Sequence, residues 1–338
     1  MIHWLGYDAA SLAHRTSAVH QTPDMSLWQG RVDHDSRYPA KRWHQIIAPY
    51  QTEHLADRLC LLGFACDAGV RRNHGRPGAA AGPAAIRQRL ANLPAIDELP
   101  IFDAGDVVCI DDQLDQAQKE LAGQIEAIRD AGGRPLVLGG GHEVAWGSFQ
   151  GLSKTLRQQP GKRLGIINFD AHFDLRDPVD GASSGTPFRQ IIEYSHQQQL
   201  AVDYLVLGIN PASNTTALFN YARDQRVYWV SDLECELQPG HTRHVIDQFL
   251  SRIDQLYLSV CLDVFPAGQA PGVSAPAAVG VTPAQVVQYL HHICTNARDR
   301  GIDHLLTDIA EMNPAYDRDG ITASLAARVI WEITSQLS

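Results

Sequence analysis

From about residue 58 onward, short apolar runs alternate with longer helix-like stretches. The apolar runs have the length of buried strands and cover residues 59–64, 100–102, 135–138, 164–169, 204–209, 227–230, 256–262 and 305–309. Helix-like stretches separate most of them, for example residues 113–131, 187–200, 243–253, 283–298 and 321–336. Strands that alternate with helices pair in parallel through right-handed crossovers, which leaves a sheet covered on both faces. The pattern therefore predicts a three-layer α/β/α fold with a mostly parallel sheet of about eight strands.

Residues 1–57 do not follow this alternation and form an irregular lead-in rich in Trp, His and Asp. No internal repeat, low-complexity tract or long linker interrupts the remainder of the chain. We therefore expect an N-terminal extension over residues 1–57, packed on a single domain over residues 58–338.

Composition narrows the class of protein. With 338 residues, 44% of them hydrophobic, the chain can bury a sizeable core, and its net charge of −10 argues against nucleic acid or an anionic membrane as the main partner. No apolar run has transmembrane length, and residues 1–8 lack a secretion signal, which favours the cytoplasm. The six cysteines include no Cys-x-x-Cys pair, so neither a disulfide framework nor a structural zinc site is expected.

The strongest chemical signal is the stretch 166–174, an apolar run that ends in alternating polar residues. Every second side chain of a strand points to the same side, so Asp170, His172 and Asp174 converge if the extended backbone continues. Two carboxylates and an imidazole on one face are costly to bury without a cation. Their ligand atoms favour a divalent metal, with manganese ahead of zinc. The alternative is a strand end with solvated acids and a chance histidine.

Other chemical residues also follow apolar runs, where ligands gather in parallel sheets. Gly-Gly-Gly-His-Glu at 139–143 can deliver His142 to a metal from a helix start, whereas the spacing and residues of a phosphate loop are absent. Cys261 and Asp263 share one face of another strand end, although Cys261 can equally be a core residue. Asn210 and Glu311 follow two further runs.

Charge counting favours two metal ions. Asp170, Asp174 and Asp263 carry three negative charges and a Cys261 thiolate would add a fourth, which two divalent ions bring close to neutral. Such ions lie ~3.5–4 Å apart and lower the pKa of a bridging water, so that hydroxide is available near neutral pH. Glu311 can remain free of metal and grip a cationic amidine or guanidine by paired hydrogen bonds; a loop or helix-start acid is the alternative. The pattern predicts a binuclear hydrolase.

Four motifs, taken together and in order, resemble the ureohydrolase family of arginase and agmatinase. They are Gly-Gly-Gly-His-Glu at 139–143, Asp-Ala-His-Phe-Asp at 170–174, Ser-Val-Cys-Leu-Asp at 259–263 and Asp-Ile-Ala-Glu-Met-Asn-Pro at 308–314. Within that family the chain is most similar to the formimidoylglutamases, through residues 28–31, 42–45, 69–76, 183–188 and 270–276. The resemblance implies an arginase-like catalytic domain with two manganese ions. It implies hydrolysis of N-formimidoyl-L-glutamate to L-glutamate and formamide in histidine breakdown, and a homo-oligomer.

The resemblance also implies roles for single residues. His142 and Asp174 would bind one ion, His172 and Asp263 the other, and Asp170 would bridge them. Cys261 stands where the family usually has a second bridging Asp.

For the substrate, the resemblance implies that Glu311 holds the amidine and that Arg176 binds a carboxylate, as a guanidinium does bidentately. Asp174 would pass a proton to the leaving nitrogen, and Asn210 would face the formimidoyl nitrogen. Weaker candidates for substrate contacts are Arg72, Arg76, Ser183 and Thr186.

Two departures from the family pattern qualify these roles. The Cys261 thiol is a softer and poorer manganese ligand than a carboxylate. Phe188 stands where arginase has a His that is thought to shuttle protons. Two other functions stay open at this point: a ureohydrolase acting on a guanidino acid or agmatine, and a metal-poor member without catalytic activity. The tail-binding Arg176 argues against agmatine.

Overall fold

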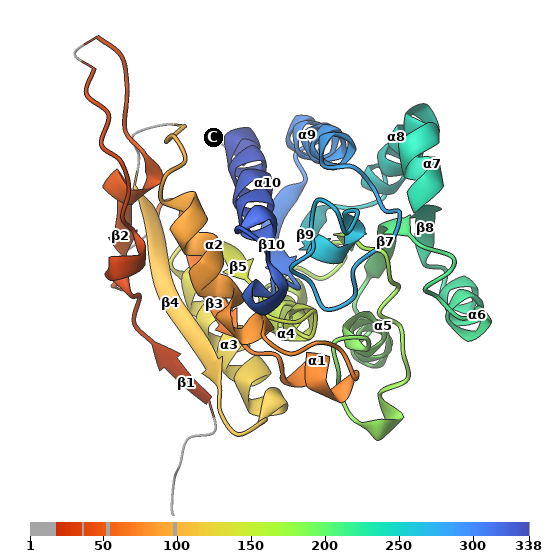
Figure 1. Ribbon diagram of the computed structural model, residues 1–338. Coiled ribbons are helices and arrows are strands. Elements are labelled where there is room, and N and C mark those ends of the chain that lie inside the picture. The colour runs from red at the N-terminus through yellow and green to blue at the C-terminus, as the bar shows by residue number, and fades with distance from the viewer. Residues whose placement is uncertain (1–17, 36, 52–54, 97–99, 338) are drawn as a thin grey trace, which may run out of the picture.

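A ten-stranded sheet organises the protein in this computed structural model, which describes residues 18–35, 37–51, 55–96 and 100–337 (Figure 1). The strand order is β1-β4-β3-β5-β10-β9-β6-β7-β8, with β2 also paired to β4, and every pair except β1–β4 is parallel. The strands are β1 Ala18–Gln21, β2 Ile47–Pro49, β3 Leu59–Ala65, β4 Ile101–Cys109, β5 Arg134–Leu138, β6 Leu164–Phe169, β7 Val202–Ile209, β8 Tyr228–Ser231, β9 Gln255–Cys261 and β10 Asp303–Ala310.

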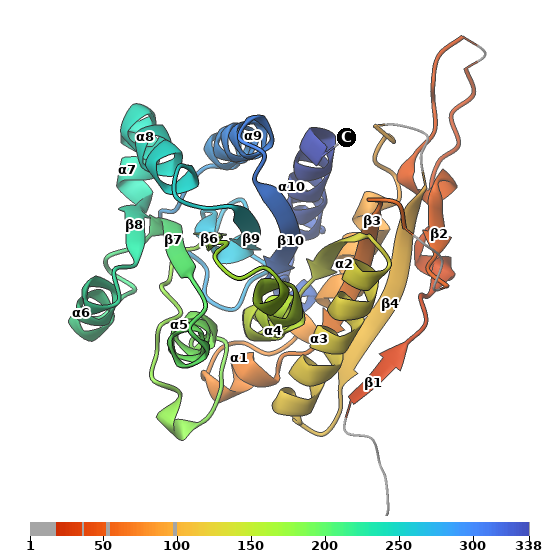
Figure 2. The same cartoon turned by 180° about the vertical axis from the view of Figure 1, so that it is seen from behind.

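Helices cover both faces of this sheet, as Figures 1 and 2 show from opposite sides. Their bounds are α1 Ala68–Arg72, α2 Gly82–Leu90, α3 Leu114–Asp130, α4 Val144–Gln158, α5 Pro187–Gln198, α6 Thr216–Asp224, α7 Asp232–Leu237, α8 Pro239–Leu250, α9 Pro283–Asp299 and α10 Ile321–Leu337. One buried core joins the sheet to α2, α8, α9 and α10, and a second joins it to α3, α4 and α5. Strand alternation supplies both cores, since Leu256 and Leu258 enter the first and Tyr257 enters the second.

The predicted three-layer, mostly parallel fold is confirmed, and all eight predicted strands are present. The predicted number of strands was low because β1 and β2 are short edge strands from the lead-in, and neither has a long apolar run. The extension predicted over residues 1–57 thus contributes two strands to the sheet. Its separation from a domain at 58–338 stays a prediction.

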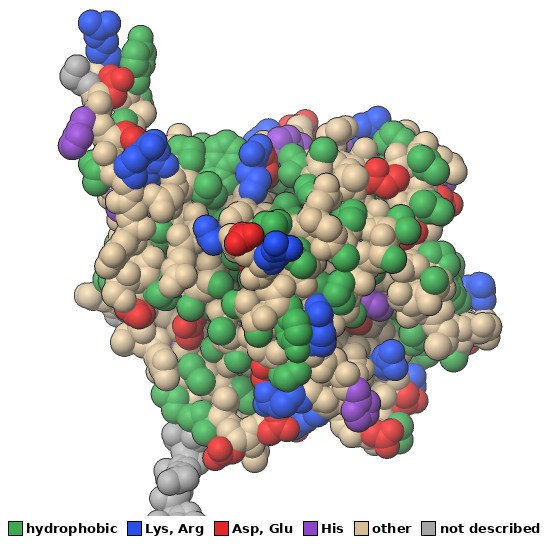
Figure 3. Space-filling view, in the orientation of Figure 1, with side chains coloured by type: hydrophobic (Ala, Val, Ile, Leu, Met, Phe, Trp, Pro, Cys, Tyr) green, Lys and Arg blue, Asp and Glu red, His purple; other side chains and the backbone are tan. Residues whose placement is uncertain are grey.

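Three further features are the lack of a membrane-spanning helix among the described residues, the N-terminal residues and an exposed loop. Within the described ranges, none of the helices has the length and apolar character needed to cross a bilayer. The expectation about a secretion signal concerns residues 1–8, which lie outside the described residues. Residues 31–35 and 37–41 form a loop that stands away from the body (Figures 1 and 3), and its Tyr38 is 71% exposed.

A buried ion-pair network fastens the lead-in to the domain. Arg87 is 1% exposed, and its guanidinium donates to both carboxylate oxygens of Asp103 at 2.8 and 2.9 Å and to Asp106 at 2.6 Å. The Trp28 indole N–H donates to the same Asp103 carboxylate at 2.9 Å. Asp103 is completely buried, so its charge depends on these donors.

Replacing Arg87 by Met is expected to lower the free energy of unfolding by about 3–5 kcal/mol, because the substitution leaves the Asp103 charge buried and unpaired. Denaturant titration would measure the change. The matched control is Arg89→Met, in the same helix, because the Arg89 side chain is exposed and, among the described residues, donates only to the Asp319 carbonyl. Equal stability of the two variants would contradict the role given to Arg87.

Candidate active site

Four adjacent strands, β5, β10, β9 and β6, end at the same edge of the sheet and bring the candidate residues together. His142 follows β5, Glu311 follows β10, Cys261 ends β9, and Asp170 follows β6. Parallel strands place their carboxyl ends on one edge, so motifs far apart in the sequence meet there.

The stretch after β6 converges by turning rather than by continuing as a strand. The Asp170 carboxylate accepts the His172 backbone N–H at 2.7 Å, and the Asn214 side chain accepts the Phe173 N–H at 3.1 Å. Asp174 then takes a left-handed backbone conformation with φ of +50°. The three polar residues therefore gather as predicted, but the extended backbone assumed for them ends at Phe169.

The glycine loop brings His142 close to the neighbouring strand ends. A Cβ at residue 140 would lie 1.7 Å from the Cys66 carbonyl oxygen, so only glycine fits there. The His142 backbone N–H donates to Glu311 at 2.9 Å, and its ring Nε2 lies 3.0 Å from Ser259 Oγ. These contacts leave the Nδ1 atom of His142 facing the carboxylates.

The ligand atoms form two groups around a shared Asp170. In the first group, His142 Nδ1 lies 2.9 Å from Asp170 Oδ2 and 3.0 Å from Asp174 Oδ2, and Cys261 Sγ is close to His142 and Asp170. In the second, His172 Nδ1 lies 3.5 Å from Asp170 Oδ1, and a further contact joins it to Asp263. One ligand atom each from His142, Asp170 and Cys261 lies within 4.8 Å of the others, close enough to hold a metal ion. The same holds for Asp170, His172 and Asp263.

The two imidazoles are held among negative charges. Burial by itself lowers the pKa of His142, but Asp170 and Asp174 raise that pKa well above its usual value. Burial likewise lowers the pKa of His172, and Asp263 and Asp170 outweigh it. The carboxylates around both rings therefore need a balancing positive charge. Neutral imidazoles are the form that binds metal, so a cation would take over this balancing charge.

Burial and mutual repulsion act on the acids. Burial, followed by the charge of Asp170, raises the pKa of Asp174 to about 6. Burial and the surrounding carboxylates raise the pKa of the Cys261 thiol well above its usual value. One oxygen of Asp263 is buried without a hydrogen-bond partner. Burying several acidic groups side by side is energetically costly unless cations neutralise them, so this arrangement fits a site for divalent cations.

These groups line a cavity of about 280 Å³. Eight of the predicted site residues line it: Arg76, His142, His172, Asp174, Arg176, Cys261, Asp263 and Glu311. Asp170 lies completely buried beneath them. Sequence reasoning named none of several further lining residues, which include Asn73, His74, Ser184, Ser213, Asn214 and Ser274. Asn73, His74, Ser184 and Ser274 lie inside motifs already quoted for the family, which is the signal that could have found them.

Four predicted substrate contacts do not line this cavity. Arg72 donates to the carbonyls of Ala182 at 3.2 Å and Asp112 at 2.8 Å. Ser183 and Thr186 bond to each other within one turn, where the Thr186 hydroxyl accepts the Ser183 N–H at 3.0 Å. The Asn210 amide donates to Ser213 at 3.1 Å. These groups therefore already have partners within the protein, and their contact with substrate stays a prediction.

Phe188 lies behind the site. It is 1% exposed, meets the His142 ring edge-on at 5.2 Å and stacks on Tyr204 at 4.3 Å between ring centroids. Its ring therefore packs against that of His142, and Phe188 is not among the residues that line the cavity.

Replacing Cys261 by Asp is expected to raise the affinity for Mn²⁺ by about tenfold or more, because a hard carboxylate replaces a soft thiol. Dialysis followed by metal analysis would measure the affinity. A second readout is the near-ultraviolet sulfur-to-metal absorption of the Co²⁺-loaded protein, expected for the unaltered chain and absent from the Asp variant. Cys294→Ser, a buried cysteine in α9, is the control. Unchanged affinity together with no such absorption in the unaltered chain would exclude Cys261 as a ligand.

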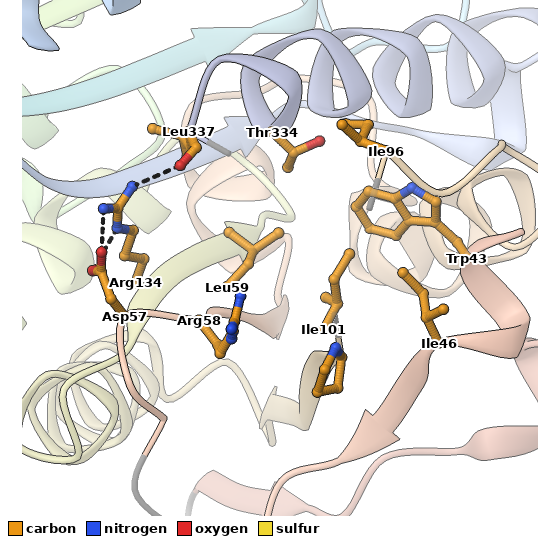
Figure 4. Close-up of a pocket in the computed structure, with 11 residues that line it drawn as sticks. Trp43, Ile46, Asp57, Arg58, Leu59, Ile96, Ile101, Arg134, Thr334 and Leu337 are labelled. Atoms are coloured by element: carbon orange, nitrogen blue, oxygen red, sulfur yellow. Dashed lines mark hydrogen bonds and ion pairs between the residues drawn. The ribbon is translucent and has the colours of Figure 1, made fainter. Parts of the chain in front are cut away.

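A second cavity lies at the opposite edge of the sheet, where β3, β4 and β5 begin (Figure 4). Leu59, Ile101 and Trp43 supply much of its wall, and Arg134 pairs with Asp57 beside it. Neither group of metal-binding side chains found in the described residues belongs to it. We therefore place the candidate active site at the carboxyl edge.

The chain is similar to known proteins along most of its length. The model of the Arginase family matches residues 57–335. A formimidoylglutamase of Ralstonia nicotianae is 46% identical over 316 residues, which cover 92% of this chain and 95% of that protein. One from Aliivibrio fischeri is 43% identical over 331 residues and covers 92% and 94%, respectively.

Solved structures agree on the fold. The Trypanosoma cruzi formiminoglutamase with Mn²⁺ has a TM-score of 0.72 at 25% identity and covers 84% of this chain and 94% of its own. The Bacillus subtilis formimidoylglutamase has a TM-score of 0.77 at 21% identity and covers 91% and 94%, a likeness of fold.

Proposed function

The chain belongs to the arginase family, and on that premise we propose that it hydrolyses N-formimidoyl-L-glutamate to L-glutamate and formamide. The observation that carries the proposal is one cavity that combines a metal-binding cluster, the Glu311 carboxylate and the Arg176 guanidinium. The metal cluster can activate water for hydrolysis, the Glu311 carboxylate can bind an amidinium, and the Arg176 guanidinium can bind a carboxylate. Relatives at 43–46% identity that span most of the chain bear the name formimidoylglutamase.

The cluster suits two divalent metal ions, with manganese proposed for both. His142, Asp174 and Cys261 would hold one, His172 and Asp263 the other, and Asp170 would serve both. When bound, such a pair lowers the pKa of water and supplies a hydroxide nucleophile near neutral pH. The solved Trypanosoma cruzi relative was crystallised with Mn²⁺.

Glu311 and Arg176 would fix the substrate from its two ends. One Glu311 oxygen accepts the His142 N–H at 2.9 Å, and the other is buried without a hydrogen-bond partner. That free oxygen suits an N–H of the cationic formimidoyl group. Arg176 is exposed at the cavity and has no hydrogen bond or ion pair from its side chain among the described residues, so its guanidinium is available to a substrate carboxylate.

Asp174 would move the proton that the reaction needs. When the formimidoyl carbon is attacked, the bond to the glutamate nitrogen breaks only if that nitrogen is protonated, since an amide anion is a very poor leaving group. Asp174 lines the cavity next to His142. A carboxyl group in this place can take a proton from the attacking water and give it to the leaving nitrogen.

A homo-oligomer also stays a proposal, which rests on the resemblance alone.

The test is formamide release from N-formimidoyl-L-glutamate by protein loaded with Mn²⁺ and by metal-free protein. We expect formamide and L-glutamate in equal amounts from the loaded protein alone. Arginine, agmatine and a guanidino acid are assayed in parallel for urea. Urea release without formamide would assign the chain to another ureohydrolase activity, and no product from any substrate would favour a non-catalytic member.

A further inference from the structure

We propose that His74 binds one of the two carboxylates of the substrate and Arg176 the other, so that His74 helps to select a dicarboxylate. This inference rests on the proposed function and goes beyond it, because it concerns the end of the substrate away from the reacting carbon. N-formimidoyl-L-glutamate carries an α-carboxylate and a side-chain carboxylate. Each loses water on entering the cavity and needs a charged or hydrogen-bonding partner there.

Arg76 is not free to be that partner, although it lines the cavity. Its guanidinium donates to the carbonyls of Ser274 at 3.1 Å and Pro271 at 3.3 Å, and it also donates to the Val273 carbonyl. It lies over the Tyr316 ring at 4.0 Å as well. Arg76 thus anchors the loop 271–274 and has little capacity left for a ligand.

Two cationic or potentially cationic groups outside the metal cluster remain on the cavity wall, Arg176 and His74. Within the described ranges, neither side chain has a hydrogen bond or an ion pair. Space is reserved for the Arg176 side chain, because a Cβ at Gly185 would lie 2.7 Å from its Cδ atom. Two free groups of this kind match the two carboxylates of the substrate in number. Both carboxylates can then be paired at once.

The backbone holds His74 in place. His74 has φ of +58°, a left-handed conformation in which Asn, Asp and His are over-represented. The next residue is fixed too, since the Gly75 N–H donates to the Val70 carbonyl at 2.9 Å and a Cβ there would lie 2.3 Å from Ser274 Oγ. The exposed imidazole therefore stands at the cavity wall on a supported loop, ready to donate a ring N–H to a carboxylate.

His74→Asn is the informative variant, because Asn tolerates the same left-handed backbone but offers only a shorter, neutral side chain. We expect KM for N-formimidoyl-L-glutamate to rise about tenfold, with kcat little changed, as for loss of one partly exposed charge-assisted hydrogen bond. Metal content and the thermal unfolding midpoint should match those of the unaltered protein. His241→Asn, at an exposed position of α8, is the matched control and should leave KM unchanged.

Truncated substrates decide whether the effect is carboxylate binding. N-formimidoyl-4-aminobutanoate lacks the α-carboxylate, and N-formimidoyl-2-aminobutanoate lacks the side-chain carboxylate. The effect of His74→Asn on kcat/KM should vanish with one of them, and that of Arg176→Met should vanish with the other. Equal effects of His74→Asn on all three substrates, or none on the full substrate, would overturn the inference while formamide release by the unaltered protein upholds the proposed function. If the unaltered protein releases no formamide, both fail.

Discussion

Asp174→Asn is expected to lower kcat by about 10²–10⁴-fold, the usual loss when a positioned acid–base group is removed. Asparagine has nearly the same shape, but it cannot carry a proton from the attacking water to the leaving nitrogen. It is also a weaker ligand for a divalent cation than a carboxylate. The Asp174 side chain lies 3.0 Å from His142 Nδ1 and lines the cavity. The same carboxylate would therefore transfer the proton and bind the metal, and the substitution would weaken both.

Metal analysis at saturating Mn²⁺ would separate the two losses. A variant that keeps its metal and loses turnover has lost proton transfer, and a variant that loses metal has lost a ligand. Asp180→Asn is the control, because this exposed carboxylate lies six residues later in the same loop and outside the cavity. Turnover near the level of the unaltered protein would contradict both roles given to Asp174.

The sequence predicted the fold well because each main strand can be recognised from its own residues. Runs such as Leu164–Phe169 are apolar along their whole length, as buried parallel strands require. The edge strands β1 and β2 carry no such signal, since pairing with β4 rather than an apolar run makes them strands. Trp28 is similar: its role depends on a hydrogen bond to Asp103, 75 residues away, which no local pattern reveals.

The site could be predicted where chemistry follows directly from strand ends. His142, Asp170, Cys261 and Glu311 each sit just past or at the end of a buried strand, and the structure brings them together. The cavity wall was harder, because a loop residue faces inward or outward according to its turn. Ser183 turns into its own loop, whereas the neighbouring Ser184 lines the cavity, and adjacent identical residues give no sequence signal for that difference.

Glu311→Gln is expected to lower kcat/KM by about 10²–10³-fold, because it removes one partner of a buried, hydrogen-bonded charge pair with the amidinium. Glu311 is 4% exposed, and burial, then Asp263 and Glu143, raise its pKa to about 8. Cations held by the adjacent cluster would lower that pKa and keep Glu311 ionised. Glutamine can still accept the His142 N–H, so the loop is preserved. Its amide N–H₂, however, would face the N–H groups of the substrate, donor against donor.

The product provides the control for this variant. L-glutamate keeps both carboxylates but lacks the amidine carbon and its outer nitrogen, so its inhibition constant should change far less than kcat/KM. Metal content should stay the same, because Glu311 belongs to neither group of metal-binding side chains. If Glu311→Gln weakened L-glutamate as strongly as the substrate, Glu311 would shape the cavity as a whole. A grip on the amidinium requires the two effects to differ, since only the substrate carries the group that Glu311 would hold.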